Sequence, residues 1–256
     1  METTSRLSVA IITYNEEKNI ARCLESVKDI ADEIIIVDSY STDQTKSIAQ
    51  SYHVRWVEHP FHGHVQQKNY ALSLATYPMV LSLDADEALS NELKQSIQNE
   101  KKHFQHMAYS MNRLSYYCGK WIKHSGWYPD KKIRLVNKHY AEWGGDNPHD
   151  KLIPRPGTPV KHLNGDILHY TYYTISEHVR QTDYFTNIAA NVAYQKGKRS
   201  NIFLILFSPV HRFIKMYFIK MGFLDGYYGF VVCAIQAFSN FLKYTKLFEL
   251  QRKNKN

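Results

Sequence analysis

The stretch LSVAIITYNEEKNIARCLESVKDIADEIIIVD, residues 7–38, decides the fold class. It begins with an apolar run that suits a buried strand, and it ends with a second such run, IIIV. Between the two runs, Ile20, Leu24, Val27 and Ile30 recur at the spacing of one helix face. The stretch therefore predicts a strand, a helix and a second strand, which is the repeating unit of a parallel sheet.

The same alternation continues to residue 87. STDQTKSIAQSY is typical of a capped helix, VRWVEH of a strand, HVQQKNYALSLAT of a helix and PMVLSLDADE of a fourth strand. We therefore expect an α/β fold with a mostly parallel, Rossmann-like sheet and flanking helices. In such sheets, ligands bind beyond the carboxyl ends of the strands. The residues at these ends are polar: Tyr14, Asn15 and Glu16, then Asp38, then Asp84 and Asp86.

The fourth predicted strand runs straight into three carboxylates within four positions, Asp84, Asp86 and Glu87. Like charges at this spacing repel, and burying them unpaired is costly. We therefore expect a cation beside them, and a divalent metal such as Mg²⁺ or Mn²⁺ is the obvious candidate. The alternative is a helix that begins here, because Asp86 and Glu87 would interact favourably with its dipole.

The net charge of +8 is concentrated in the last quarter of the chain. Residues 196–256 hold eleven Lys and Arg against two acids, a charge of +9, so the 195 residues before them are nearly neutral. This segment is also aromatic and apolar, but its longest uncharged run, 226–242, is shorter than a spanning helix needs. It predicts amphipathic helices on an anionic membrane surface. Helices that pack on the domain or form a homodimer are the alternative.

The composition argues against several classes of protein. With 44% hydrophobic and 22% charged residues, the chain is ordinary for a globular protein. Three widely spaced cysteines, Cys23, Cys118 and Cys233, form no disulfide or zinc pattern, which favours a reducing compartment. The first residues lack the apolar core of a signal peptide, so we do not expect secretion. No nucleic-acid-binding motif accompanies the basic residues, so we expect no nucleic acid partner.

The segments SVAIITYNEEKNIARCLESV, DEIIIVDSYSTDQT and LSLDADE, in this order and spacing, resemble the family 2 inverting glycosyltransferases of the GT-A fold. More narrowly, GHVQQKNYAL, YPDKKIRLVNK, HDKL, ILHYTYYT and RFIKMYFIKMGFLDGYYGF are similar to segments of the lipopolysaccharide-core glucosyltransferase (WaaE/KdtX-like) branch. The resemblance implies three functional parts. These are a nucleotide-sugar-binding half at 1–100, an acceptor-binding and catalytic half at 101–195, and a helical membrane-association or dimerisation segment at 196–256.

The resemblance also implies a donor site. The residues expected around the donor are Thr13, Tyr14, Asn15, Glu16, Asp38, Lys68, Asp84, Ala85, Asp86 and Arg134. Among them, Glu16 is expected to contact the nucleotide, Asp38 to accept a hydrogen bond from uracil N3–H, and Asp84 to lie near the ribose and sugar. Asp86 is the expected metal ligand, and His169 is a candidate second ligand.

Several of these residues have a plainer structural alternative. Asp38 could cap a helix, and Lys68 could be an exposed helix lysine rather than a contact to the diphosphate or the base. Arg134 could sit at a strand edge instead of binding phosphate. His169 could be a hydrogen-bonded core histidine.

An inverting transfer needs a carboxylate that takes the proton of the attacking acceptor hydroxyl. The segment GGDNPHDKL offers Asp146 and Asp150. The resemblance favours Asp150, with His149 as its neighbour, and leaves Asp146 as the second candidate. A salt bridge in a surface loop is the alternative for either carboxylate.

The resemblance thus implies a metal-dependent inverting glycosyltransferase that uses Mg²⁺ or Mn²⁺. It would move a sugar, expected to be glucose, from a UDP-sugar to a lipid-linked saccharide such as the lipopolysaccharide inner core. Its expected place is the cytoplasmic face of a bacterial inner membrane. A polyprenyl-phosphate or protein acceptor, and a non-catalytic nucleotide-sugar-binding scaffold, are the alternatives. The residues do not identify the sugar, because the candidate sugars differ by single hydroxyls or an acetamide.

Overall fold

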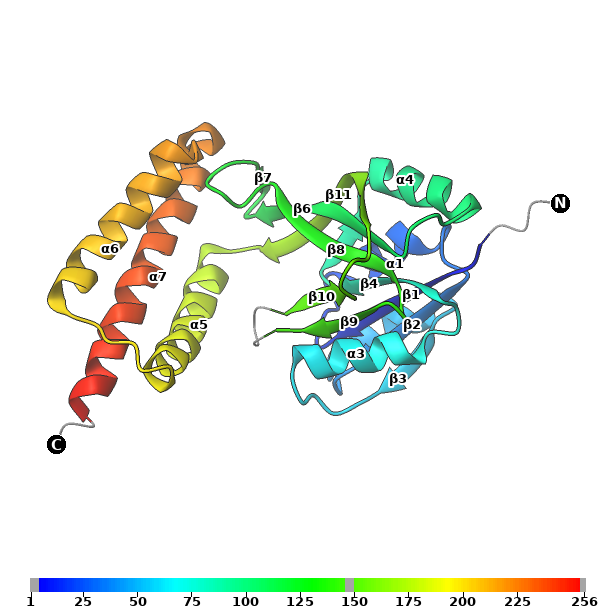
Figure 1. The fold of residues 1–256 in the computed structure, drawn as a ribbon, viewed down its shortest axis with the longest axis horizontal. Coiled ribbons are helices and arrows are strands. Elements are labelled where there is room, and N and C mark those ends of the chain that lie inside the picture. The colour runs from blue at the N-terminus through cyan, green and yellow to red at the C-terminus, as the bar shows by residue number, and fades with distance from the viewer. Residues whose placement is uncertain (1–4, 146–149, 254–256) are drawn as a thin grey trace. The chain divides into compact units, whose positions relative to one another are not determined.

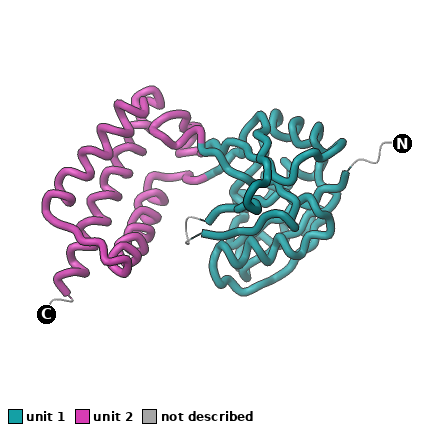
Figure 2. The backbone as a smooth tube through the Cα atoms, viewed as in Figure 1, with its two compact units in different colours: residues 1–114, 130–170 teal, residues 115–129, 171–256 magenta. Residues whose placement is uncertain are grey.

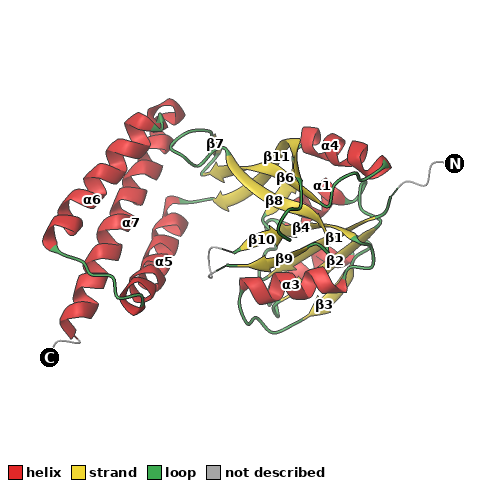
Figure 3. Ribbon diagram, in the orientation of Figure 1, coloured by secondary structure: helices red, strands yellow, loops and turns green. Residues whose placement is uncertain are grey.

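The structure is a computed structural model, and it describes residues 5–145 and 150–253. The chain divides into two compact units, one made of 1–114 with 130–170 and the other of 115–129 with 171–256 (Figure 2). The first unit is built from strands and helices, whereas the second is mainly helical (Figure 3).

The first unit begins with the predicted alternation of strands and helices (Figure 1). In chain order these elements are β1 (Leu7–Thr13), α1 (Ile20–Val27), β2 (Glu33–Asp38), α2 (Thr45–Gln50), β3 (Arg55–Glu58), α3 (His64–Leu74) and β4 (Met79–Asp84). The four strands are parallel neighbours in the order β3-β2-β1-β4. Thr13 is level with Asp38, and Ile12 is level with Asp84. The polar strand ends therefore meet at one edge of the sheet, as predicted.

The rest of this unit extends the sheet with antiparallel strands. The further elements are β5 (Glu87–Leu89), α4 (Asn91–Lys102), β6 (Ala108–Tyr117), β8 (Asp130–Asn137), β9 (Ala141–Gly144), β10 (Lys151–Pro154) and β11 (Val160–Tyr172). The sheet continues in the order β4-β8-β6-β11-β5, and β9 pairs with β10 as a separate hairpin. The complete sheet is therefore mixed, and its parallel part is limited to the first four strands.

Both faces of β1, β2 and β4 are buried, since successive side chains of a strand point to opposite faces and almost all of theirs are buried. On one face Val9 and Ile11 pack in a core with residues of α1, α2 and α4. On the other face Ala10 packs with residues of α3 and of the β9–β10 hairpin. This burial explains why β1, β2 and β4 are apolar runs in the sequence.

The second unit contains the predicted C-terminal helices. Its elements are β7 (Lys120–Ile122), α5 (Ile175–Gln195), α6 (Ile202–Ile214), a π-helical turn η1 (Lys215–Ile219), a 3-10 turn η2 (Gly222–Asp225) and α7 (Gly226–Lys253). α7 packs against both α5 and α6 (Figure 1). The three functional parts expected from the sequence cut the chain at other positions than these units do, and they remain a proposal about roles.

The turn before α7 is held by close packing and by a buried carboxylate. A Cβ atom on Gly229 would lie 2.0 Å from the carbonyl oxygen of Gly222, so only glycine fits there. Asp225 is 3% exposed and accepts hydrogen bonds from the backbone N–H groups of Lys123 and His124, at 3.2 and 2.8 Å. Much of the motif MGFLDGYYGF therefore has a packing role within this unit.

An aromatic cluster fills the core of the second unit. Nδ1 of the buried His178 lies 3.0 Å from the hydroxyl oxygen of Tyr117, and the ring of Tyr172 stacks on His178 at 4.5 Å. Burial lowers the pKa of His178 to about 4, so the imidazole is neutral at pH 7. Trp127 packs in the same cluster, as aromatic side chains in a core commonly do.

Candidate active site

The three carboxylates predicted to need a cation lie around a tight turn between β4 and β5. Asp84 ends β4, and Ala85 and Asp86 form the turn. The N–H of Ala85 donates to the carbonyl oxygen of Ile12 at 3.2 Å, and the N–H of Tyr170 donates to that of Asp86 at 2.9 Å. The turn is therefore fixed between β1 and β11. The alternative of a helix beginning at Asp86 is wrong, because β5 follows the turn and α4 begins only afterwards.

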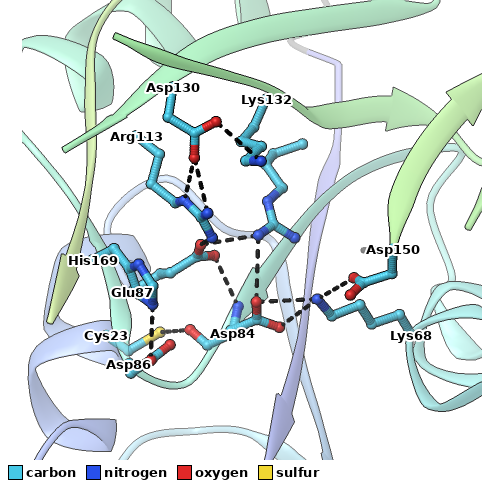
Figure 4. Close-up of polar contacts among 11 residues, drawn as sticks. Cys23, Lys68, Asp84, Asp86, Glu87, Arg113, Asp130, Lys132, Asp150 and His169 are labelled. Carbon is cyan, nitrogen blue, oxygen red and sulfur yellow. Dashed lines mark hydrogen bonds and ion pairs between the residues drawn. The ribbon is translucent and has the colours of Figure 1, made fainter. Parts of the chain in front are cut away.

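Two of the three carboxylates are paired with cations of the protein itself (Figure 4). Nζ of Lys68 lies 3.0 Å from Asp84, and Nη2 of Arg134 lies 3.3 Å from Asp84 and 2.9 Å from Glu87. Nη1 of Arg113 lies 3.5 Å from Glu87. Cations are thus present where the charge argument requires them, but for these two residues they are side chains and not a metal.

Glu87 is one of the three carboxylates, but the sequence analysis did not include it among the residues of the donor site. Its side chain is 1% exposed, and its carboxylate accepts a hydrogen bond from the backbone N–H of Asp84 at 3.1 Å. Glu87 also accepts a hydrogen bond from Arg134, so it links the start of the turn to β8. Its signal in the sequence was an acid at the head of the otherwise apolar strand EAL. Such a residue needs a buried partner, which only the tertiary structure reveals.

The neighbours of Asp84 and Arg134 favour the charged forms of these two groups. Burial alone would raise the pKa of Asp84, but the charges of Lys68 and Arg134 outweigh it and hold this pKa well below its usual value. Burial would lower the pKa of Arg134, and the charges of Glu87 and Asp84 raise it instead. We call the ion pairs that join Lys68, Asp84, Glu87 and Arg134 the ionic frame.

Asp86 differs from Asp84 and Glu87 in its partner, which is a histidine rather than a lysine or an arginine. Its side chain is 26% exposed, and its Oδ2 lies 3.1 Å from Nε2 of His169 (Figure 4). A carboxylate oxygen and an imidazole nitrogen that converge in this way are acceptable ligands for a divalent cation. Within residues 5–145 and 150–253, no group of three or more His, Cys, Asp or Glu side chains is arranged to hold a metal. Any ion at this pair would take its other ligands from substrate and water.

The segment after β1 is fastened to the loop after β2. Asn15 has a left-handed backbone with φ of 53°, and its Oδ1 accepts the N–H of Thr42 at 2.8 Å. The N–H of Glu16 donates to Oγ1 of Thr45 at 2.7 Å. Burial, and next the negative charge of Asp86, raise the pKa of Glu16 to about 7. Glu16 thus belongs to the same electrostatic environment as Asp86.

Asp38 ends β2 and is 1% exposed. Its Oδ2 accepts the backbone N–H of Ser41 at 2.8 Å, and its Oδ1 accepts the hydroxyl of the same residue. This is a turn-capping geometry, related to the structural alternative stated for Asp38. It does not prevent contact with a base, because each carboxylate oxygen has a second lone pair. At the neighbouring strand end Thr13 is buried and Tyr14 is 58% exposed.

Lys68 links the strand-end carboxylates to the β9–β10 hairpin. It is 4% exposed, so the alternative of an exposed helix lysine is wrong. Its Nζ lies 2.8 Å from Oδ2 of Asp150, just before β10, and 4.5 Å from the ring centre of Trp143 on β9. The Asp150 side chain is 12% exposed, so this ion pair is largely buried rather than on a surface loop. Two residues discussed with Asp150 lie outside the described part of the chain: Asp146 and His149.

Arg134 lies on β8, 3% exposed, and is not a strand-edge residue. Its guanidinium carbon lies 5.0 Å from the ring centre of Trp143. Two of its buried nitrogens, Nε and Nη1, have no hydrogen-bond acceptor among the described residues. These donors are positioned beside Asp84, at the edge where the strand ends meet.

Comparison with known proteins agrees with this arrangement. Residues 8–156 match the model of the family described as Glycosyl transferase family 2. An uncharacterised glycosyltransferase of Rickettsia typhi is 34% identical over 98% of this chain and 89% of its own length. The lipopolysaccharide core biosynthesis glycosyltransferase LpsC of Rhizobium meliloti is 26% identical over 95% of this chain and 92% of its own length.

Two solved structures are similar in fold. The mannosyltransferase PcManGT from Pyrobaculum calidifontis, in complex with GDP-Man and Mn²⁺, has a TM-score of 0.53 at 14% identity, over 94% of this chain and 86% of its own. S. aureus TarS 1–349 in complex with UDP has a TM-score of 0.50 at 16% identity, over 97% of this chain and 92% of its own. At these identities the likeness concerns the fold. Together with the family match and the R. typhi relative, it shows that the chain belongs to glycosyl transferase family 2 and is a glycosyltransferase with the GT-A fold.

Proposed function

We propose that this glycosyltransferase is a metal-dependent, inverting enzyme that transfers a hexose, with glucose as the first candidate, from a UDP-sugar to a lipid-linked saccharide. The observation that carries the proposal is that the three carboxylates have different partners. Buried Lys and Arg side chains pair with Asp84 and Glu87, whereas the partner of Asp86 is the imidazole of His169. This difference supports a cation site at Asp86 and His169, at the edge of the sheet where open α/β sheets bind ligands.

Asp86 and His169 would hold the metal, with donor phosphates and water as the other ligands. When bound, Mg²⁺ or Mn²⁺ supplies positive charge for the departing diphosphate. The Mn²⁺ in the complex of the P. calidifontis mannosyltransferase supports an ion of this kind.

The donor itself would lie along the polar strand ends. Asp38 would accept the uracil N3–H, and Glu16 would contact the nucleotide, in the loop that Asn15 fastens in place. Arg134 would donate to a donor phosphate, because an acceptor there would satisfy its two unpaired buried nitrogens. Lys68 would add positive charge on the same side.

Asp150 is the residue that we propose as general base. The acceptor hydroxyl attacks the anomeric carbon from the face opposite the diphosphate, the carbon–phosphate oxygen bond breaks, and Asp150 takes the hydroxyl proton. Lys68 ties Asp150 to Asp84, and so couples the base to the donor side of the site. Asp146 remains the second candidate for this role.

The lipopolysaccharide inner core is the acceptor that we propose first. The similarity to the lipopolysaccharide core biosynthesis glycosyltransferase of R. meliloti supports it. The +9 charge of residues 196–256 supports it as well, because the lipids of the bacterial inner membrane are anionic. We therefore propose that the enzyme works on the cytoplasmic face of a bacterial inner membrane. A polyprenyl-phosphate acceptor would use the same donor site and is the alternative.

Calorimetry of donor binding tests the proposal. UDP-, GDP- and dTDP-sugars are titrated into the full chain with Mn²⁺ and then with a chelator. We expect one UDP-sugar to bind only with metal, and this binding to be lost in Asp86→Ala. Asp29→Ala is the matched control, because Asp29 is an exposed carboxylate of the same unit whose ion pair is with Lys94. Binding that is equal with and without metal, or equal in the two variants, would contradict the metal assignment.

A further inference from the structure

Helix α6 exposes an apolar stripe along its length. Ile202, Leu206, Val210 and Ile214 follow one another at four-residue spacing, and each is between 47% and 57% exposed. Two phenylalanines beside this stripe are 68% and 64% exposed, Phe203 and Phe207. A contiguous exposed patch of this kind marks an interaction surface, because a monomer gains nothing by leaving such large apolar side chains in water.

The turns that follow α6 continue this apolar surface. Across η1, η2 and the first turn of α7, several large side chains are between 45% and 68% exposed: Phe218, Ile219, Met221, Phe223, Leu224 and Tyr227. Together with the stripe on α6, we call these residues the apolar face of the second unit. The face therefore extends over a helix and the tip that follows it.

The charges beside this face have a single sign. Between Asp183 and Asp225 the sequence contains no acidic residue, but it contains six basic ones: Lys196, Lys198, Arg199, Arg212, Lys215 and Lys220. Five of the six side chains are exposed, three just before α6 and two after it. Asp225 itself is buried and accepts backbone hydrogen bonds. The surface around the apolar face is thus positive at both ends of the helix.

The helix is suited to lie along a bilayer rather than to cross it. The stretch Ile202–Ile219 is long and apolar enough to be considered as a span by length and composition, and only 11% of it is buried. Its 18 residues cover about 27 Å, less than a hydrocarbon core of about 30 Å, and they include Arg212 and Lys215. Its other face packs on α7, where Nδ2 of Asn240 donates to Oγ of Ser208 at 3.0 Å.

We infer that the apolar face inserts into the headgroup–acyl boundary of an anionic bilayer, with α6 parallel to the membrane plane. The exposed phenylalanines enter the acyl region, and the lysines and arginines at the two ends of α6 contact anionic headgroups. A second copy of the chain fits this face less well, because it would bring two positive surfaces together. The inference rests on α6 and the following turns, and not on the donor chemistry.

Vesicle co-sedimentation of the full chain tests this inference. One vesicle contains phosphatidylcholine alone, and the other contains equal parts of phosphatidylcholine and phosphatidylglycerol. We expect binding to the anionic vesicle that is at least about tenfold tighter and that weakens with added salt. The double variant Phe203→Glu/Phe207→Glu should reduce this binding by about tenfold or more.

The matched control is Phe61→Glu/Tyr140→Glu, which adds the same two charges at exposed aromatic residues of the first unit and should bind vesicles like the wild type. Equal binding by both double variants, or no preference for the anionic vesicle, would overturn the inference. Light scattering without lipid provides a further check. A dimer that only Phe203→Glu/Phe207→Glu dissociates would show that a second copy covers this face. Donor calorimetry on the same samples separates a failure of this inference from a failure of the proposed enzyme function.

Discussion

The two units of the chain treat charge in opposite ways. In the α/β unit, the buried side chains of Glu87 and Arg134 form an ion pair, and Arg134 also contacts the partly exposed Asp84. In the helical unit the buried His178 is neutral, while most basic side chains lie at the surface beside exposed apolar ones. Buried ion pairs and exposed apolar side chains both cost stability. Each unit therefore departs from a stable globular protein at the place where we expect it to bind its substrate or its membrane.

The largest effect should come from the base in the α/β unit. We expect Asp150→Asn to lower turnover roughly a thousandfold, because an amide cannot take the proton of the acceptor hydroxyl. Donor binding should change little, since Lys68 keeps its contact with Asp84. Steady-state kinetics with the donor identified by calorimetry measures both quantities. Asp130→Asn is the control, because Asp130 pairs with Arg113 and Lys132 and has no proposed catalytic role. Turnover retained in Asp150→Asn would move the role to Asp146.

The second effect concerns the ionic frame. We expect Glu87→Gln to lower the free energy of unfolding by about 3 kcal/mol, because it leaves Arg134 buried with one full countercharge fewer. Urea denaturation measures this loss. Glu25→Gln removes an exposed pair with Lys28 and should cost less than about 1 kcal/mol. If the two variants lost equal stability, the buried ion pairs of the frame would contribute no more than an exposed pair. The contrast between the two units would then be contradicted.

Much of the fold could be predicted because its first half is local. Strands β1, β2 and β4 are buried apolar runs and α1 is amphipathic, so their pattern is visible within short windows of sequence. The antiparallel half depends on pairings between distant segments. β5, for example, pairs with β11, which follows it by some 70 residues in the sequence. Periodicity within one segment cannot reveal such a partner.

The same limit applies to the candidate site. The positions of Asp38 and Asp84 at strand ends could be predicted from the alternation alone. The pairing of β5 with β11 sets His169 level with Glu87 and so brings it to Asp86, and only the fold shows this. The charge argument correctly required a cation beside the carboxylates. It could not foresee that the cations of Asp84 and Glu87 would come from α3 and β8.

A third effect should appear in the helical unit as a dependence on pH. The pKa of His178 is about 4 in the folded state, against 6.5 for an ordinary histidine, so the unfolded chain binds more protons between these values. This residue should therefore lower the free energy of unfolding by about 2–3 kcal/mol as the pH falls from 6.5 to 4. His178→Phe should remove that loss, whereas His62→Phe, at an exposed position, should leave it unchanged. Denaturation at a series of pH values decides between the two outcomes.

The smallest effect has the opposite sign and belongs to the α/β unit. The pKa of Glu16 is raised from 4.5 to about 7, so here the folded state binds more protons than the unfolded chain in that window. Its contribution to stability is complete below pH 4.5 and is lost as the pH rises towards 7, by about 1–2 kcal/mol once its partial exposure is considered. Glu16→Gln, which keeps an oxygen for the side chain of Asn19, should remove this loss when metal is absent. Denaturation in chelator should then show that the two variants change the pH dependence of the free energy of unfolding in opposite directions. His178→Phe should remove a loss that occurs as the pH falls, and Glu16→Gln should remove a loss that occurs as the pH rises. If both variants changed it in the same direction, the buried charge environments of the two units would not differ in the way that their contacts indicate.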